Sequence, residues 1–195
     1  MSDVSGKLSD AEVIARFKGG DKAIFQKLVE RYAGRAYQIA YGVLGSREDA
    51  EEVAQDVFVR IFRSLERFRG DSEFTTWMYR IAMNLARNKY RWNKSRGAKR
   101  EISLQQTLDD DESRALIQLA EERPSPDQAN ELSEFETNVM REIENLPALY
   151  RDALVLRNVE EMSYEQIAEI LGCKLGTIKS RIARAREELR KRLGV

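Results

Sequence analysis

The sequence predicts an all-α protein of two small helical bundles joined by an acidic flexible linker, with a helix-turn-helix in the C-terminal bundle. Apolar residues recur at helical spacing along most of the 195-residue chain, and no segment shows a convincing strand-like alternation. The three prolines, at 124, 126 and 147, lie in or just after a segment rich in acidic residues. We therefore expect an N-terminal domain over residues 1–98, a linker over 99–132 and a C-terminal domain over 133–195.

The N-terminal part predicts four helices. Ser9 and Glu12 form a capping-box pattern that opens a short helix, which ends at Gly19-Gly20. Asp21 caps a second helix that ends at Gly45, Ser46 caps a third, and the turn at 68–72 leads into a fourth. The expected buried faces are Phe25, Leu28, Val29, Tyr32, Ala36, Ile39 and Val43 in the second helix, Val53, Val57, Phe58, Ile61, Phe62, Leu65 and Phe68 in the third, and Phe74, Met78, Ile81 and Leu85 in the fourth.

The fourth helix carries a basic and aromatic surface. Between Met78 and Arg100 there are eight basic residues and no acidic one. At about 100° per residue, Arg80, Arg87, Arg91 and Lys94 form a stripe, and Trp77 and Asn84 lie between it and the apolar face. Tyr79, Tyr90 and Trp92 are interleaved with these cations. Positive charge neutralises phosphates and aromatic rings stack on bases, so the pattern favours single-stranded nucleic acid. Solvated arginines beside a core tryptophan are the alternative.

Charge divides the chain into three parts although the net charge is zero. Residues 1–100 carry 20 basic and 13 acidic residues (+7), 101–147 carry 3 and 13 (−10), and 148–195 carry 10 and 7 (+3). Acidic runs such as 109–112 keep a linker solvated, with a weak helix possible around Ser113–Ala120. Two basic ends flanking an acidic middle favour nucleic-acid contacts at both ends.

The C-terminal part predicts helices from about Glu131, from Pro147, and in a pair after Met162. Ser163 and Gln166 form a capping box, and Gly172 ends the first helix of the pair. The second begins at about Leu175, and its outward face carries Lys179, Ser180, Arg181, Arg184 and Arg186. This pattern indicates a helix-turn-helix that binds DNA. An ordinary helical hairpin with a solvated charged face is the alternative.

Cysteine and histidine usage excludes several classes of site. With Cys173 alone and no histidine, the chain has no internal disulfide and no cysteine–histidine zinc site. The N-terminus lacks signal-peptide features, and no apolar run is long enough to span a membrane. We expect a cytoplasmic protein without cofactor, metal or membrane insertion.

Two blocks of the sequence resemble a known family. The first is SREDAEEVAQDVFVRIFRSLERFRGDSEFTTWMYRIAMNLARNKYR, and the second is ENLPALYRDALVLRNVEEMSYEQIAEILGCKLGTIKSRIARAR. Both are similar to the extracytoplasmic-function (ECF) sigma factors of bacterial RNA polymerase, group IV of the sigma-70 family. The resemblance covers about Asp10 to Leu193. It implies a sigma factor that binds core polymerase, recognises promoter DNA and promotes strand opening for a stress or envelope-response regulon.

The resemblance also implies partners and site residues. The implied partners are core RNA polymerase (the clamp helices of the large subunit, and the flap), promoter DNA and an anti-sigma factor. The implied polymerase-binding residues are Asp49, Glu52, Gln55 and Asp56. The implied residues for the minus-ten element and its melting are Phe68, Trp77, Tyr79, Arg80, Asn84, Arg87 and Arg91. Those for the minus-thirty-five element are Arg157, Lys174, Gly176, Thr177, Lys179, Ser180, Arg181 and Arg184. Two positions depart from the family pattern: Lys174, where many relatives have proline, and Ala183, where relatives often carry a bulkier base-contacting residue.

Two other functions remain open from the residues. A stand-alone helix-turn-helix transcription regulator explains the C-terminal part but leaves the basic-aromatic fourth helix without a role. A nuclease holding a metal at Glu51, Glu52 and Asp56 is disfavoured, because adjacent Glu51 and Glu52 point about 100° apart on a helix. Without histidine or a convergent base, we expect no enzyme.

Overall fold

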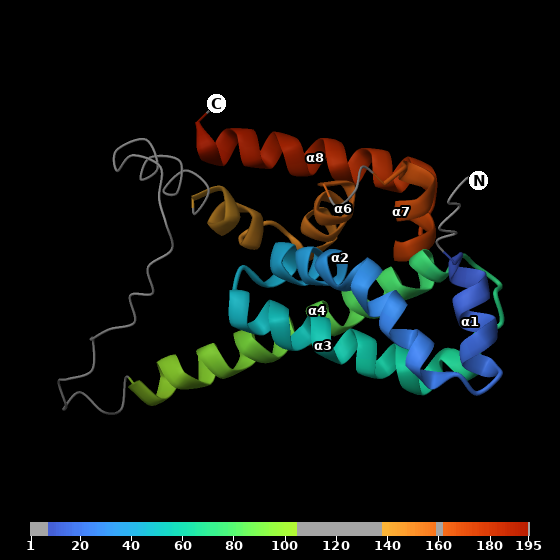
Figure 1. The fold of residues 1–195 in the computed structure, drawn as a ribbon. Coiled ribbons are helices and arrows are strands. Elements are labelled where there is room, and N and C mark those ends of the chain that lie inside the picture. Colours follow the sequence, from blue (N-terminus) through green and yellow to red (C-terminus); the bar gives the residue numbers. More distant parts are fainter. Residues whose placement is uncertain (1–7, 105–137, 159–161, 195) are drawn as a thin grey trace, which may run out of the picture.

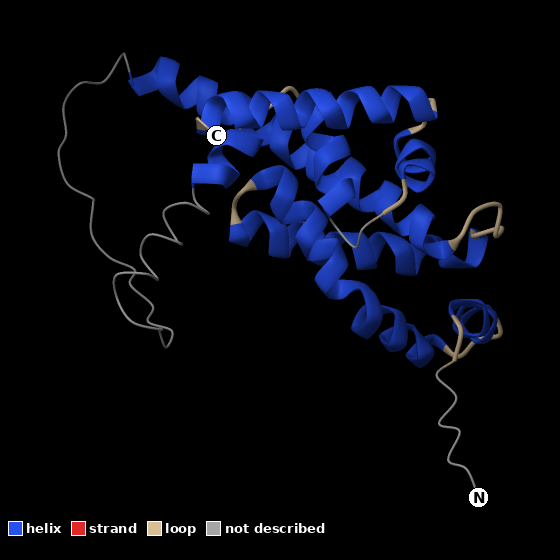
Figure 2. Ribbon diagram, turned by 90° about the horizontal axis from the view of Figure 1, so that it is seen from above, coloured by secondary structure: helices blue, strands red, loops and turns tan. Residues whose placement is uncertain are grey.

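The structure is a computed structural model that describes residues 8–104, 138–158 and 162–194, and within these residues every regular element is a helix (Figures 1 and 2). The N-terminal domain consists of α1 (Asp10–Lys18), the 3₁₀ turn η1 (Lys22–Phe25), α2 (Gln26–Leu44), α3 (Arg47–Ser64), the 3₁₀ turn η2 (Leu65–Arg67) and α4 (Phe74–Leu104). The C-terminal domain consists of the helical residues 138–144, α6 (Ala148–Asn158), α7 (Tyr164–Leu171) and α8 (Leu175–Leu193). The predicted all-α fold with two helical domains is confirmed.

Side chains cap the N-terminal helices at the predicted residues. Ser9 and Glu12 form the reciprocal capping box of α1, and the Ser46 hydroxyl accepts a hydrogen bond from the backbone N–H of Asp49 at the start of α3. Gly45 ends α2 with a φ of 67°, a left-handed conformation that favours a residue without Cβ. Asp21 caps η1, which leads directly into α2. These caps fix where each helix begins and therefore which face it turns to the core.

The core of the N-terminal domain lies between α2, α3 and α4, as Figure 1 shows. The predicted buried faces are confirmed except at Phe62, which is exposed, and at Val29, Phe68, Ile81 and Leu85, which are only partly buried against the core. Phe62 is 41% exposed and meets Phe17 and Phe25 only through edge contacts, with ring centroids 5.2 and 5.1 Å apart. In α4, Ile81 and Leu85 are half-buried, whereas the buried positions are Phe74, Thr76, Met78, Tyr79, Ala82, Met83 and Ala86. The buried face of α4 is wider than predicted because the C-terminal domain covers a second side of this helix.

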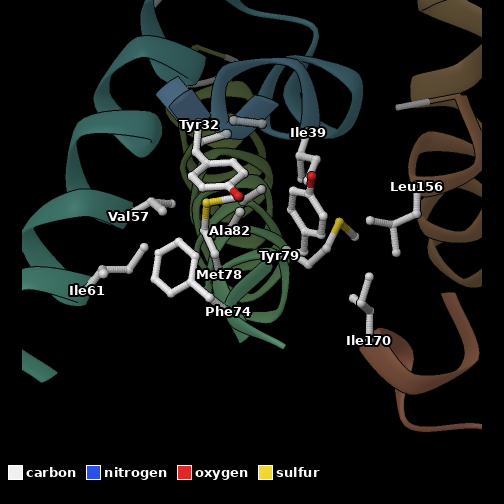
Figure 3. Packing of buried hydrophobic residues seen from close by; sticks show 14 of the residues in the cluster. Tyr32, Ile39, Val57, Ile61, Phe74, Met78, Tyr79, Ala82, Leu156 and Ile170 are labelled. Atoms are coloured by element: carbon white, nitrogen blue, oxygen red, sulfur yellow. The ribbon is translucent and has the colours of Figure 1, made fainter. Parts of the chain in front are cut away.

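Helices α6 and α7 pack against α2 and α4, so the two domains share one hydrophobic cluster. Figure 3 shows Tyr79 of α4 meeting Ile39 of α2, Leu156 of α6 and Ile170 of α7. The backbones of α2 and α6 approach closely at Gly42: a Cβ there would lie 2.8 Å from Cγ1 of Val155. The domains are therefore in contact through a packed apolar interface as well as through the chain that joins them.

Much of the predicted linker lies outside the described residues. Helix α4 continues to Leu104, past the predicted linker start at residue 99. The acidic run at 109–112, the possible helix around Ser113–Ala120 and the helix start near Glu131 all fall outside the described ranges. The proposed domain bounds stay predictions. Among the helices of the described residues, none combines the length and apolarity needed to cross a membrane.

Candidate nucleic-acid and polymerase-binding surfaces

The turn between η2 and α4 forms an aromatic pocket with Trp77. The rings of Phe68 and Trp77 lie 4.9 Å apart between centroids, at an interplanar angle of 35°. The Lys18 ammonium of α1 donates to the Phe68 carbonyl at 2.5 Å and ties the turn to the rest of the domain. A hollow of about 440 Å³ opens here, lined by Ser64, Arg67, Phe68, Arg69, Asp71, Ser72, Trp77 and Arg80. The sequence pattern placed Phe68 and Trp77 in one segment, and the structure brings both to one pocket.

Two arginines of the predicted basic stripe contact carboxylates of the C-terminal domain. Arg80 donates to the backbone carbonyl of Glu169 at 2.8 and 3.2 Å, and its guanidinium lies 3.5 Å from the Glu169 carboxylate. Arg87 forms an ion pair with Asp152 at 2.7 Å, and the Asp152 side chain is 3% exposed. Asn84 and Arg91 are exposed on α4, and Arg91 donates to the Asn88 side chain. The stripe is thus split between residues at the domain interface and residues on the surface.

Tyr79 does not belong to this surface in the structure. Its side chain is 5% exposed and lies in the shared core beside Ile39, Leu156 and Ile170 (Figure 3). Burial raises the pKa of its hydroxyl, partly offset by Arg35. The expectation that Tyr79 faces DNA therefore conflicts with this arrangement, because α6 and α7 cover the side of α4 from which Tyr79 projects.

Buried charges gather where α4 meets α6. Arg151 is 1% exposed; its guanidinium lies 3.8 Å from the centroid of the Tyr90 ring and donates to the Glu144 carbonyl at 3.1 Å. Burial raises the pKa of Asp152, and the nearby guanidinium of Arg87 only partly offsets this. Burial likewise raises the pKa of Glu144. Reasoning from the sequence missed this cluster, because Arg151 and Asp152 are adjacent charged residues and gave no periodic signal.

The predicted polymerase-binding face of α3 has two kinds of residue. Asp49 and Glu52 are engaged by α4: Lys89 lies 3.2 Å from the Asp49 carboxylate and 2.5 Å from that of Glu52, and Asn93 donates to Asp49 at 2.8 Å. The hydrogen bond with Glu52 raises the pKa of the Lys89 ammonium. Gln55 and Asp56, by contrast, are exposed.

Asp56 borders a second hollow. It measures about 360 Å³ and is lined by Asp56, Val59, Arg60, Arg63, Ser64 and Leu85. Val59 is 47% exposed beside these charged neighbours. The sequence reasoning did not include Val59, because it falls outside both the buried stripe and the acidic face.

The helix-turn-helix forms as predicted. Ser163 and Gln166 make both hydrogen bonds of the capping box, at 2.9 and 3.2 Å, and Gly172 ends α7 with a φ of 64°. Ile178, Ile182 and Ala185 bury one face of α8. The opposite face exposes Lys174, Gly176, Lys179, Ser180, Arg184 and Arg186, with Thr177 half-buried beside them. This places most of the predicted DNA-contacting residues of α8 on one accessible surface.

Two arginines assigned to the same DNA element point elsewhere. Arg181 is half-buried, donates to Sγ of Cys173 at 3.7 Å and is close enough to Asp152 to act on its pKa. Arg157, also half-buried, donates to the Met162 carbonyl, and its guanidinium lies 5.2 Å from the Tyr164 ring. In this arrangement both stabilise the C-terminal domain and neither belongs to the exposed face of α8.

No group of three or more metal-ligating side chains occurs among the described residues. The carboxylates of α3 that the nuclease alternative would need are among these described residues, and they form no such group.

Comparison with known proteins identifies the family. Residues 28–96 match Sigma-70 region 2, and residues 136–189 match Sigma-70, region 4. The chain is 38% identical over 184 residues to the RNA polymerase sigma-H factor of Pseudomonas aeruginosa, covering 94% of this chain and 93% of that protein. It is 36% identical to the ECF RNA polymerase sigma-E factor of Haemophilus influenzae and 34% identical to that of Escherichia coli K12, each over about 95% of both chains.

Solved structures with the same fold include two proteins that were determined in complexes. CnrH, in complex with the cytosolic domain of CnrY, matches with a TM-score of 0.66 at 24% identity over 93% of this chain and 95% of CnrH. The sigma factor RpoE of Bartonella quintana, in complex with the anti-sigma factor NepR, matches with a TM-score of 0.56 at 25% identity over 88% and 97%. The predicted resemblance is confirmed, and so is the expectation of a non-enzymatic protein. The chain belongs to the ECF group of the sigma-70 family and is an RNA polymerase sigma factor that initiates transcription.

Proposed function

We propose that this sigma factor divides promoter recognition between its two domains, with α4 and the preceding turn taking the melted minus-ten element and α8 reading the minus-thirty-five element. The observation that carries this proposal is the hollow lined by the packed rings of Phe68 and Trp77, with Arg80 at its wall. Aromatic faces for a base and a cation for its phosphate therefore lie within one hollow. Two unlike DNA modules on one chain would also give transcription a direction.

The chemistry of the pocket suits a base that has left the stack. Extruding a base from a duplex costs a few kcal/mol, and a protein compensates by stacking and by hydrogen bonds to the base edge. Phe68 and Trp77 supply the stacking faces, while Ser64, Ser72 and Asp71 supply polar groups around the rim. Asn84, exposed two turns further along α4, would continue the path of the strand, with Arg87 and Arg91 beside it.

The face of α8 suits the major groove of duplex DNA. Lys179 and Arg184 are both exposed on α8, and Lys174 and Thr177 lie at its N-terminal end. A single recognition helix makes few contacts, which is why many helix-turn-helix proteins bind as dimers. In this chain the second DNA module, together with polymerase, would take the place of a second subunit.

For core polymerase, we propose that Gln55, Asp56 and the neighbouring Val59 contact the clamp helices of the large subunit, and that the C-terminal domain contacts the flap. Exposed polar and apolar groups meet at this part of α3. Asp49 and Glu52 would act less directly, because Lys89 already pairs with both. We further propose a cytoplasmic location, an anti-sigma partner like the one that binds the RpoE relative, and a stress or envelope-response regulon.

Run-off transcription tests this proposal. Purified core polymerase is incubated with promoter templates in the presence and absence of the chain, and the transcript start is mapped. The chain should confer a unique start downstream of separate minus-thirty-five and minus-ten elements. A stand-alone regulator would require a resident sigma factor in the same reaction. Specific transcripts that survive scrambling of either element would contradict the division of labour between the domains.

A further inference from the structure

We propose that Lys18 of α1 is a positioning residue for the aromatic pocket: its hydrogen bond to the Phe68 carbonyl holds the Phe68 ring in place for a base of the minus-ten element. The inference rests on the proposed function of this pocket and names a residue outside α4 and its preceding turn on which that function depends. Lys18 precedes residues 28–96, which match Sigma-70 region 2, so that match gives it no role. In this proposal Lys18 acts through Phe68 and not by touching DNA.

The first argument is that the backbone leaves helical geometry at Phe68. This residue ends η2 with a φ of −64° and a ψ of 118°, an extended conformation, while its N–H donates to the Leu65 carbonyl at 3.1 Å. A carbonyl at the end of a helical turn has no partner within that turn and is satisfied by a side chain or by water. The Lys18 ammonium, 50 positions earlier in the chain, donates to this carbonyl at 2.5 Å. The hydrogen bond therefore fixes the plane of the peptide that follows Phe68.

The second argument is that the Phe68 ring follows its backbone. The rotamers open to a side chain depend on the φ and ψ of its residue, so holding the carbonyl limits the directions that the ring can take. In the observed direction the ring lies 4.9 Å from that of Trp77 and meets Phe74 edge-on at 6.3 Å, both measured between centroids. Phe68 is only half-buried, so packing alone leaves its ring with freedom that the hydrogen bond from Lys18 removes.

The third argument is that α1 and η1 hold the same turn at a second point. The Lys22 ammonium pairs with the Glu66 carboxylate at 2.6 Å, donates to the Phe17 carbonyl at 3.2 Å and lies 4.0 Å from the centroid of the Phe17 ring. The hydrogen bond from Lys22 lowers the pKa of Glu66, so the pair stays charged at neutral pH. Leu65 is fully buried. The beginning of the turn is thus fixed, and Lys18 holds the residue at which the chain enters the pocket.

Two simpler roles for Lys18 predict different behaviour. As a cation in the last turn of α1, it would stabilise that helix through the helix dipole. As an exposed cation, it would bind a DNA phosphate. Neither role depends on whether a base sits in the pocket. A positioning role does, because the Phe68 ring contributes to binding only when there is a base to stack on it.

The test uses holoenzyme assembled from core polymerase and the full-length chain, with fork-junction DNA whose minus-ten element is single-stranded on the non-template strand. A tetrahydrofuran residue, which lacks a base, replaces each nucleotide of that element in turn. Lys18→Met removes the donor and keeps an unbranched side chain. Arg16→Met is the matched control, because Arg16 lies on the same helix but pairs with Asp21 instead of the turn. Helicity by circular dichroism and core affinity should be parental for both variants.

Lys18→Met should weaken binding of the intact fork DNA by about threefold to tenfold, the loss that corresponds to one net hydrogen bond. This loss should disappear at one position of the scan, where the base is absent and both holoenzymes bind equally, and should persist at the other positions. Arg16→Met should bind every DNA like the parent. A loss of the same size at all positions would overturn the proposal and assign Lys18 to helix stability or to a phosphate. Absence of any loss would overturn it as well, and so would the same base-dependent loss in Arg16→Met.

Failure of the pocket itself gives a different result. If the parental holoenzyme binds equally well whichever base is removed, no base is captured. The proposed function of the pocket then falls, and the role of Lys18 falls with it. If the parental holoenzyme depends on a base but Lys18→Met loses the same factor at every position, only the inference about Lys18 falls.

Discussion

Arg87 of α4 and Asp152 of α6 form an ion pair between the two domains, with Nε 2.7 Å from Oδ2, and Asp152 is almost fully buried. This pair connects a residue proposed to hold DNA with a residue of the domain that reads a different DNA element. A buried carboxylate is stable there only because cations surround it: Arg87 from α4, Arg151 from its own helix and Arg181 from α8. Any change in the separation of the domains must therefore alter the electrostatics of Asp152.

Domain docking should depend on pH through this carboxyl. Burial raises the pKa of Asp152 although all three neighbouring guanidinium groups act to lower it. The docked form then holds a proton more tightly than the separated form, in which the pKa returns to its ordinary value. The stabilisation of docking is complete below that ordinary pKa and is lost as the pH rises through the raised one.

The docked fraction of the free chain should consequently increase as the pH falls through the raised pKa of Asp152, measured by small-angle scattering or by energy transfer between the domains. The chain has no histidine, so no imidazole contributes to this change. Burial also raises the pKa of Glu144, which acts in the same direction. Asp152→Asn should reduce the pH dependence. An unchanged dependence in that variant would assign the titration to other groups.

Two glycines of α2 should respond oppositely to the same substitution. Gly34→Ala should stabilise the chain by about 0.5–1 kcal/mol, because alanine loses less conformational entropy in a helix and nothing lies within 4 Å. Gly42→Ala should lack this gain, since its Cβ would lie 2.8 Å from Cγ1 of Val155. Urea unfolding midpoints of the two variants measure the difference. Equal stabilisation by both would mean that α2 and α6 are not in contact in solution.

Charge reversal on α3 should weaken polymerase binding without unfolding the domain. Asp56 is exposed, whereas Val53, Val57 and Ile61 form the buried face of α3, so Asp56→Arg should leave the core intact. Core affinity, measured by competition with a labelled sigma factor, should fall clearly for Asp56→Arg. Glu30→Arg, an exposed reversal on α2, serves as the control and should bind normally. Normal affinity of Asp56→Arg with an unchanged circular dichroism spectrum would refute the proposed polymerase face.

Arg184 on the recognition helix α8 should contribute to sequence-specific DNA binding. Arg184 is exposed on α8 and lies 3.4 Å from the Tyr150 hydroxyl, which holds it at the surface. Losing a cation that bonds a base edge typically costs about 1–3 kcal/mol. Arg184→Ala in holoenzyme should therefore weaken binding to minus-thirty-five DNA and flatten its salt dependence. Arg190→Ala, near the C-terminal end of α8, should change little. A defect confined to the minus-ten element would mean that the domain assignments are reversed.

The helices and caps could be predicted from the sequence because their signals are local. The capping boxes at Ser9 and Ser163 and the left-handed Gly45 and Gly172 each depend on residues within one turn. The position of Tyr79 could not be predicted in the same way. Its burial depends on α6 and α7, which follow it by more than 60 residues. The sequence pattern predicts one apolar face on α4 and leaves the other side for DNA. In the structure the C-terminal domain covers part of that other side.

The site residues likewise divide into those set by local helical periodicity and those set by contacts between distant segments. The exposed face of α8 follows from helical periodicity, since the partner face is its own domain core. The pairing of Lys89 with Asp49 and Glu52 links two helices, and that of Arg80 with Glu169 links two domains; neither leaves a periodic pattern in the sequence. The resemblance assigned Arg157 and Arg181 to DNA, but their orientation depends on contacts with the Met162 carbonyl and the Cys173 sulfur, which helical periodicity does not reveal.

The proposed role of α4 in strand opening is tested most directly by comparing Asn84→Ala on two templates in run-off transcription with core polymerase. Asn84 is exposed on α4, so its loss should leave the fold and the core affinity unchanged. Because its proposed contact forms only after a base leaves the stack, the variant should transcribe a pre-melted promoter bubble at nearly the parental level and the intact duplex poorly. Equal defects on both templates would contradict the account, because Asn84 would then support folding or general DNA affinity instead of strand opening.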